Sequence, residues 1–197
     1  MALGFTKSSG EDFLPSFRFN AVSGDAVIVG SKKNADGVTW DKFENEVTFP
    51  AKFIFDFANL EVGWIHFAAP GPSFALVKIG ERMPAKPSEE HKQGFRVKLF
   101  SKAHGLSAFS NSSRTIAEVM DALHDQYLAG EKANSGKVPV VEIKGVKKVQ
   151  VKTKEGAKNY KQPVWAIVSW VARPEELTEK AIEEVAKAAE PEASDDF

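Results

Sequence analysis

The lysines of residues 144–161 are the side chains in this chain best suited to bind a polyanion. This stretch holds seven lysines and a single acidic residue, Glu155. Val149 and Val151 alternate with polar residues, a period of two that predicts a strand with one apolar and one basic face. The basic face consists of Lys148, Gln150, Lys152 and Lys154. A row of lysines on a sheet can follow a phosphate backbone. The alternative is a solvated face, or an edge strand that lysines protect from aggregation.

A second group of candidates lies on the strand expected at residues 94–101. Its odd-numbered residues are apolar, so Arg96, Lys98 and Phe100 fall on the other face. An exposed aromatic ring beside two cations is suited to stack on a nucleic-acid base while the cations hold phosphates. The alternative is that Phe100 packs beneath a neighbouring loop.

The residue patterns of common enzymes and metal sites are missing. There is no cysteine, and the four histidines are too scattered to form a zinc-ligand pair. Residues 130–137 superficially resemble a phosphate-binding loop, but five residues separate the glycines where the motif needs four, and Val138 stands in place of Ser or Thr. We therefore expect no catalytic activity, no cofactor and no metal.

Charge is distributed unevenly along the chain. Residues 174–197 contain nine acidic residues and two lysines, a net charge of −7, so residues 1–173 carry +6. Such an arrangement suggests a polyanion-binding body with its own anionic competitor. Residues 190–197 combine four acids with a terminal Phe197. A partner could capture the ring in a pocket and the free carboxylate on basic residues.

Hydrophobic periodicity predicts a mainly β fold with one internal helix. Strands are expected at residues 46–57, 60–68, 74–81, 94–101, 138–143, 146–154 and 163–172. Residues 155–162 are expected to form a polar loop. A helix is predicted from an N-cap at Thr115, with Glu118 completing a capping box, to a C-cap at Gly130. This order excludes an alternating parallel α/β fold and fits a Greek-key barrel of the oligonucleotide-binding (OB) type; a β-sandwich with an inserted helix is the competing architecture.

The ending Asp195-Asp196-Phe197, the basic body and the strand order together resemble the single-stranded DNA-binding proteins of bacteria and phages. Residues 5–19, with their short Gly- and Ser-containing leader, also look like the phage proteins. The chain lacks the compact domain and long Gly/Gln-rich linker of bacterial members, so their tetramer cannot be carried over. The resemblance implies that the tail recruits replication and repair proteins and competes with DNA.

These expectations define four regions: a leader at residues 1–16, an OB-like domain at 17–173, a short C-terminal helix at 174–189, and a disordered acidic tail at 190–197. The residues expected to contact DNA are Lys52, Arg96, Lys98, Phe100, Lys147, Lys148, Lys152, Lys154 and Tyr160. The residues expected to contact partner proteins are Asp195, Asp196 and Phe197.

The function expected from the sequence is sequence-independent binding of single-stranded DNA in replication, recombination or repair. Polymerase, primase or helicase are the expected partners of the tail. No apolar run is long enough to span a membrane, and a cytoplasmic protein is expected, in the host cell if a phage encodes it. The competing function is that of a virion structural or assembly protein that does not bind nucleic acid.

Overall fold

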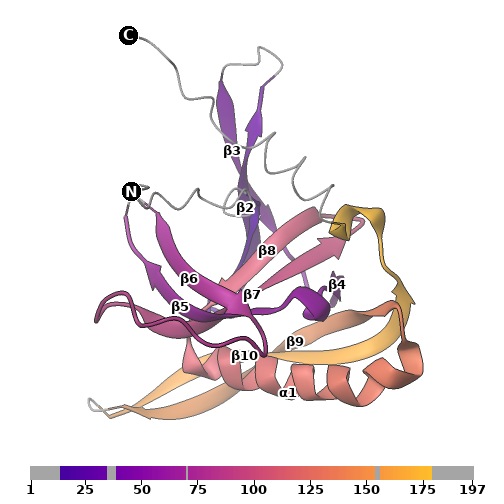
Figure 1. The fold of residues 1–197 in the computed structure, drawn as a ribbon. Helices are drawn as coiled ribbons and strands as arrows, with labels where there is room; N and C mark the ends of the chain where they lie inside the picture. The colour runs from indigo at the N-terminus through magenta and orange to yellow at the C-terminus, as the bar shows by residue number, and fades with distance from the viewer. Residues whose placement is uncertain (1–13, 35–38, 70, 154–155, 179–197) are drawn as a thin grey trace, which may run out of the picture.

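The computed structural model describes residues 14–34, 39–69, 71–153 and 156–178. It confirms a mainly β protein with one α-helix (Figure 1). The strands are β1 (Ser16–Phe19), β2 (Ala26–Lys33), β3 (Trp40–Glu46), β4 (Ala51–Phe55), β5 (Glu61–Phe67), β6 (Pro72–Lys78), β7 (Lys92–Ser101), β8 (Gly105–Asn111), β9 (Lys137–Thr153) and β10 (Gly156–Ala172). The helix is α1 (Arg114–Glu131), and the 3₁₀ turns are η2 (Phe57–Asn59), η3 (Lys132–Asn134) and η4 (Glu175–Leu177). None of the described helices is long and apolar enough to cross a bilayer.

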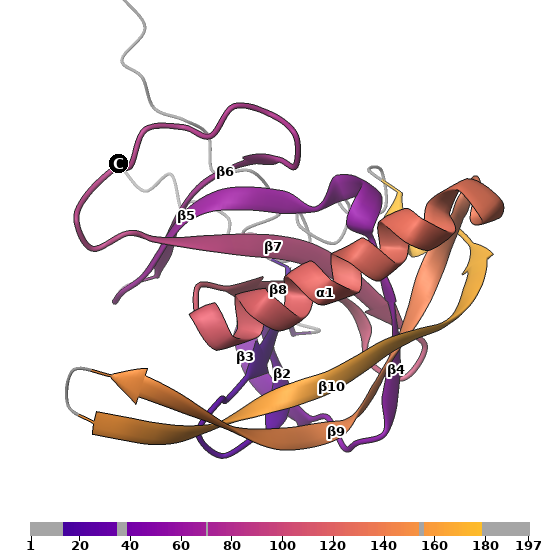
Figure 2. The same cartoon turned by 90° about the horizontal axis from the view of Figure 1, so that it is seen from below.

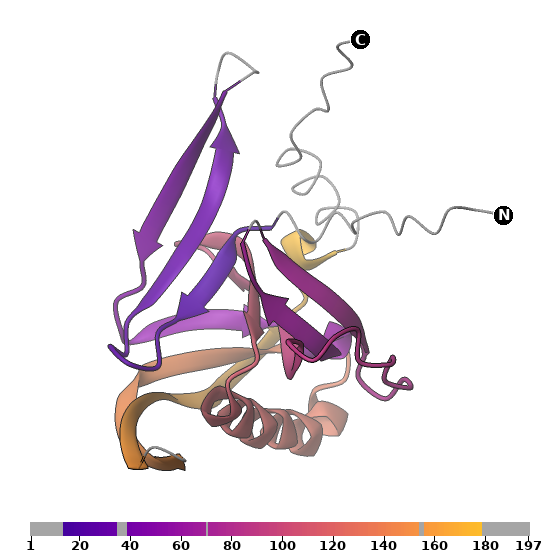
Figure 3. The same cartoon turned by 90° about the vertical axis from the view of Figure 1, so that its left-hand side faces the viewer.

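All ten described strands belong to one sheet. Its main path runs β10-β9-β4-β7-β8-β1-β2-β3, and the β5–β6 hairpin joins it through the pairing of β5 with β7. β1 pairs with β8 in parallel, so both edges of β8 are occupied. The sheet therefore continues outward to β2 and β3 instead of closing on β10, and the predicted OB-like Greek-key barrel is not confirmed. Figure 3 shows the β2–β3 hairpin standing away from the rest of the sheet.

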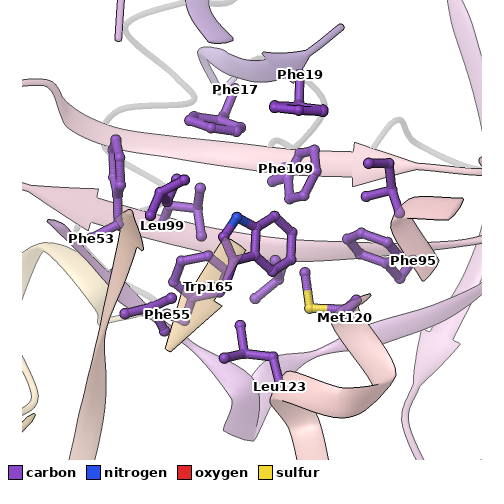
Figure 4. Packing of buried hydrophobic residues seen from close by; sticks show 14 of the residues in the cluster. Phe17, Phe19, Phe53, Phe55, Phe95, Leu99, Phe109, Met120, Leu123 and Trp165 are labelled. Carbon is purple, nitrogen blue, oxygen red and sulfur yellow. The ribbon is translucent and has the colours of Figure 1, made fainter. Parts of the chain in front are cut away.

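The core is built mainly from aromatic rings on the inner face of the curved sheet. Phe109 lies at its centre, with its ring 5.1 Å from that of Phe17, 5.3 Å from Phe95 and 5.9 Å from Trp165 (Figure 4). These pairs meet edge to face, which suits the quadrupoles of the rings. α1 supplies buried residues to the same cluster and covers it on one side (Figure 2).

The alternation expected at residues 46–57 is present, with Phe53, Phe55 and Phe57 all buried. The ordered strand is shorter, Ala51–Phe55, and η2 follows it.

The helix is placed correctly by its apolar spacing, but its predicted caps are wrong. Ser113 is the N-cap, and Thr115 lies inside the first turn, where it is buried. Glu118 accepts a hydrogen bond from Arg114 Nε at 3.0 Å instead of completing a capping box. Gly130 stays within the helix, and the indole of Trp170 packs 2.6 Å from where a Cβ would stand, so no larger side chain fits at this position.

Two other sequence expectations are corrected by the pairing of β9 with β10. Residues 138–143 and 146–153 fall in the same strand, and residues 156–162 are part of β10 rather than a loop. Their pairing with residues 147–153 makes them a strand, although they have no hydrophobic alternation. At the C-terminal end of the described chain only η4 forms, and the rest of the helix expected at 174–189 lies outside the described residues.

Candidate nucleic-acid interface

Arg96 and Lys98 are both buried, so the exposed strand face predicted for them is wrong. Their exposed fractions are only 6% and 7%. Glu61 on β5 lies opposite Arg96, and Arg96 Nε donates to Glu61 Oε2 at 2.7 Å while Nη2 donates to Oε1 at 3.3 Å. The guanidinium also lies 5.1 Å from the ring centre of Phe74. Its charge is thus largely balanced within the fold.

Phe100 is half-buried, as the alternative from the sequence proposed. It packs with Ile54 against a second apolar cluster formed by Leu14, Leu106, Ala108 and Leu177. Phe100 also borders an open groove of about 900 Å³. Lys52 lines this groove, its side chain 62% exposed and its Nζ 3.7 Å from a Glu142 carboxylate oxygen. The groove is mainly apolar and does not include the other candidate lysines.

The β9–β10 hairpin carries the predicted lysines, but on two faces. Lys148 and Lys152 share one face, opposite Lys161 and Ala157 on the neighbouring strand. Lys147 is on the other face together with Tyr160. Val149 and Val151 lie on this same face, so the face expected to be apolar also carries lysine. Lys154 lies outside the described residues. The predicted site is therefore divided among β7, the groove beside Lys52, and the two faces of this hairpin.

A groove that sequence reasoning missed lies on the outer face of β7 and β8. It has a volume of about 800 Å³, and its lining comes from β1 and β2 on one side and the β5–β6 hairpin on the other. The lining side chains that can contact a nucleic acid are Arg18, Phe67, Phe74, Arg96, Ser110 and Asn111.

Among these six side chains, Arg18 and Phe67 are the exposed ones. Phe67 is 55% exposed and meets Phe74 edge to face, with ring centres 6.5 Å apart. Arg18 is exposed on β1 between two buried phenylalanines. The alternation Phe17-Arg18-Phe19 was a usable sequence signal, because it places a cation on the outer face of a buried strand. The groove therefore offers the exposed ring of Phe67 for stacking and the exposed cation of Arg18, while the guanidinium of Arg96 is paired with Glu61.

The hairpin that carries Phe67 is held in place by the loop after β6. Trp64 Nε1 donates to the Pro84 carbonyl at 2.9 Å, and Lys86 lies 5.6 Å from the Trp64 ring. His91 is buried between the hydroxyls of Ser88, at 2.8 Å, and Ser73, at 3.2 Å. These contacts fix the β5–β6 hairpin relative to β7 and so fix one wall of the groove.

Comparison with known proteins finds no match to a protein-family model, to a curated protein or to a solved structure. Function has to be argued from the chain's own residues. The predicted partner-binding residues Asp195, Asp196 and Phe197 lie outside the described residues. Within the described residues, no group of three or more metal-ligating side chains occurs.

Proposed function

We propose that this protein binds single-stranded DNA without sequence preference, in the groove on the outer face of β7 and β8. The observation that carries the proposal is the pairing of an exposed ring, Phe67, with an exposed cation, Arg18, across one groove. Every base has a face that can stack on an aromatic ring, and every nucleotide has a phosphate. A site built from these two contacts therefore tolerates any sequence.

The strand order supports an OB-like origin for the site. β4 and β5, interrupted by η2, run along one edge of β7, and β4 also pairs with β9. In the proposed plan, the order β4/β5, β7, β8, α1, β9, β10 would make five strands of an OB-like Greek key with the helix between the third and fourth. OB folds bind oligonucleotides on their second and third strands, which here are β7 and β8. The present chain departs from this plan where β1 occupies the edge of β8.

Charge supports the same function. The net charge of +6 on residues 1–173 attracts a polyanion over a distance of about a Debye length. Asp195, Asp196 and Phe197 would then have the role implied by the resemblance. They would compete with DNA and recruit replication proteins such as a polymerase, primase or helicase, in the cytoplasm of the cell where that DNA is copied.

The direct test is a titration of labelled oligothymidylate, and of duplex of the same length, at several salt concentrations. Binding to the single strand should weaken with salt, with a slope of about −0.7 in log K against log salt for each phosphate neutralised. Mixed-sequence single strands should bind within a few-fold of oligothymidylate. Equal or tighter binding to the duplex, or no salt dependence, would refute the proposal.

A further inference from the structure

The distal half of the β9–β10 hairpin has no packing role in the described fold. β10 pairs with no described strand except β9, and β9 pairs with β4 only at residues 140–143. Lys161 is the last point of attachment, where its Nζ donates to the Ser23 carbonyl and its backbone N–H to the Ala21 carbonyl. Residues 147–153 and 156–160, called here the ribbon, extend from this point past α1 as a two-stranded arm, with Lys147 at its base opposite Gln162 (Figure 2).

The ribbon is basic on both of its faces. Lys148 and Lys152 are exposed on one face, with Gln150 opposite Asn159 between them. The other face carries Lys147 and Lys158, which are also exposed. In residues 144–161 the only acid is Glu155. Protection of an edge strand explains some of these lysines, but not an arm in which no described side chain is fully buried and both faces are charged.

This geometry fits a groove with phosphates on both of its walls. The major groove of a DNA duplex is about 12 Å wide and admits a two-stranded β-ribbon. A β layer with its side chains is about 10 Å thick, and seven residues of strand reach roughly 23 Å. A ribbon that enters tip first would thus bring the lysines of each face to a different phosphate backbone. Lysine acts there as a mobile point charge, so this contact needs no particular sequence.

We propose that the ribbon is a second nucleic-acid site, whose ligand is the backbone of duplex DNA. This inference rests on the proposed function. If single-stranded DNA binds in the groove and duplex DNA binds to the ribbon, a junction of duplex and single strand is the preferred ligand. The two sites share no lining residue, since none of the ribbon residues borders the groove of Arg18 and Phe67.

Three probes test the inference: a single strand, a duplex, and a junction in which the same single strand continues from the same duplex. The wild-type chain should bind the junction at least tenfold more tightly than the single strand at equal salt. Two paired variants probe the two faces, Lys148→Gln with Lys152→Gln, and Lys147→Gln with Lys158→Gln. Each pair should reduce the salt slope for the junction by about 2, at roughly 0.9 per phosphate contact on duplex DNA.

A matched control changes two exposed lysines outside the ribbon, Lys42→Gln with Lys78→Gln, and should keep the tenfold junction preference. Circular dichroism of each variant checks that the sheet is intact. The inference is overturned if the wild-type chain binds the junction no better than the single strand, or if both ribbon pairs keep the preference. It is also overturned if the ribbon pairs weaken single-strand and junction binding equally, which would make the ribbon part of the single-strand site. If the wild-type chain does not bind the single strand, the groove is refuted as a single-strand site. That result does not refute duplex binding by the ribbon.

Discussion

Phe67→Ala is the substitution that tests the stacking role of the groove most cleanly. The side chain is 55% exposed, so a free ring face is available to a base. Removal of an aromatic ring that stacks on a base costs about 1–3 kcal/mol of binding free energy. Since 1.4 kcal/mol is a factor of ten, Kd for oligothymidylate should rise by about 5- to 150-fold. Phe67→Trp keeps a stacking surface and should retain most of the affinity.

The same substitution should have a small effect on folding. Full truncation of a buried phenylalanine costs about 3–5 kcal/mol, and less than half of Phe67 is buried, so we expect a loss of about 1–2 kcal/mol in urea unfolding. Leu128→Ala is a suitable control, because Leu128 is 49% exposed on α1 and borders none of the described grooves. It should lose comparable stability and keep wild-type DNA binding.

Fluorescence anisotropy at several salt concentrations separates stacking from charge. Phe67→Ala should shift Kd with an unchanged salt slope, whereas Arg18→Ala should reduce the slope by about 0.7. Wild-type affinity in Phe67→Ala, or an equal loss in Leu128→Ala, would refute the stacking role.

Three further predictions concern the frame of the site and the tail. Arg173→Ala should destabilise the protein by about 3 kcal/mol in urea unfolding, because it leaves the fully buried carboxylate of Asp56 without its ion pair. The control Arg114→Ala removes an exposed ion pair and should change stability little. Equal losses of stability in the two variants would contradict this. Deletion of residues 190–197 should tighten single-strand binding most at low salt, where screening is weakest; unchanged binding at low salt would reduce the acidic end to a solubility tail. Burial and a hydrogen bond to a neighbouring carboxylate raise the pKa of the Tyr127 phenol well above its ordinary value near 10. Stability should therefore fall as pH rises above about 10, less steeply in Tyr127→Phe, and identical alkaline unfolding profiles would show that Tyr127 does not contribute.

Local patterns predicted much of the fold. The alternation around Phe53 and the apolar spacing of the helix identify their elements because each depends on one buried face. The ends of the helix were not predictable in the same way. Several hydroxyl side chains lie near its start, and the packing of Trp170 on Gly130 joins residues 40 positions apart.

The site was predicted less well, because burial of a polar strand face depends on distant segments. Nothing near Arg96 in the sequence indicates that Glu61, 35 residues earlier, will pair with it. Similarly, residues 156–160 form a strand only because the lysine-rich strand lies beside them. The high lysine content of residues 144–161 singled out this hairpin in the sequence. Only the pairing register of β9 with β10 shows that its lysines lie on both faces.

Photo-crosslinking of oligothymidylate to the full chain, followed by mass spectrometry of the crosslinked peptides, locates the bound strand directly. If single-stranded DNA binds in the groove on β7 and β8, the strongest crosslinks should fall on Phe67 and Phe74, and excess unlabelled single strand should remove them. Crosslinks confined to the groove beside Lys52 and Phe100, with none on the β5–β6 hairpin, would contradict the proposed site.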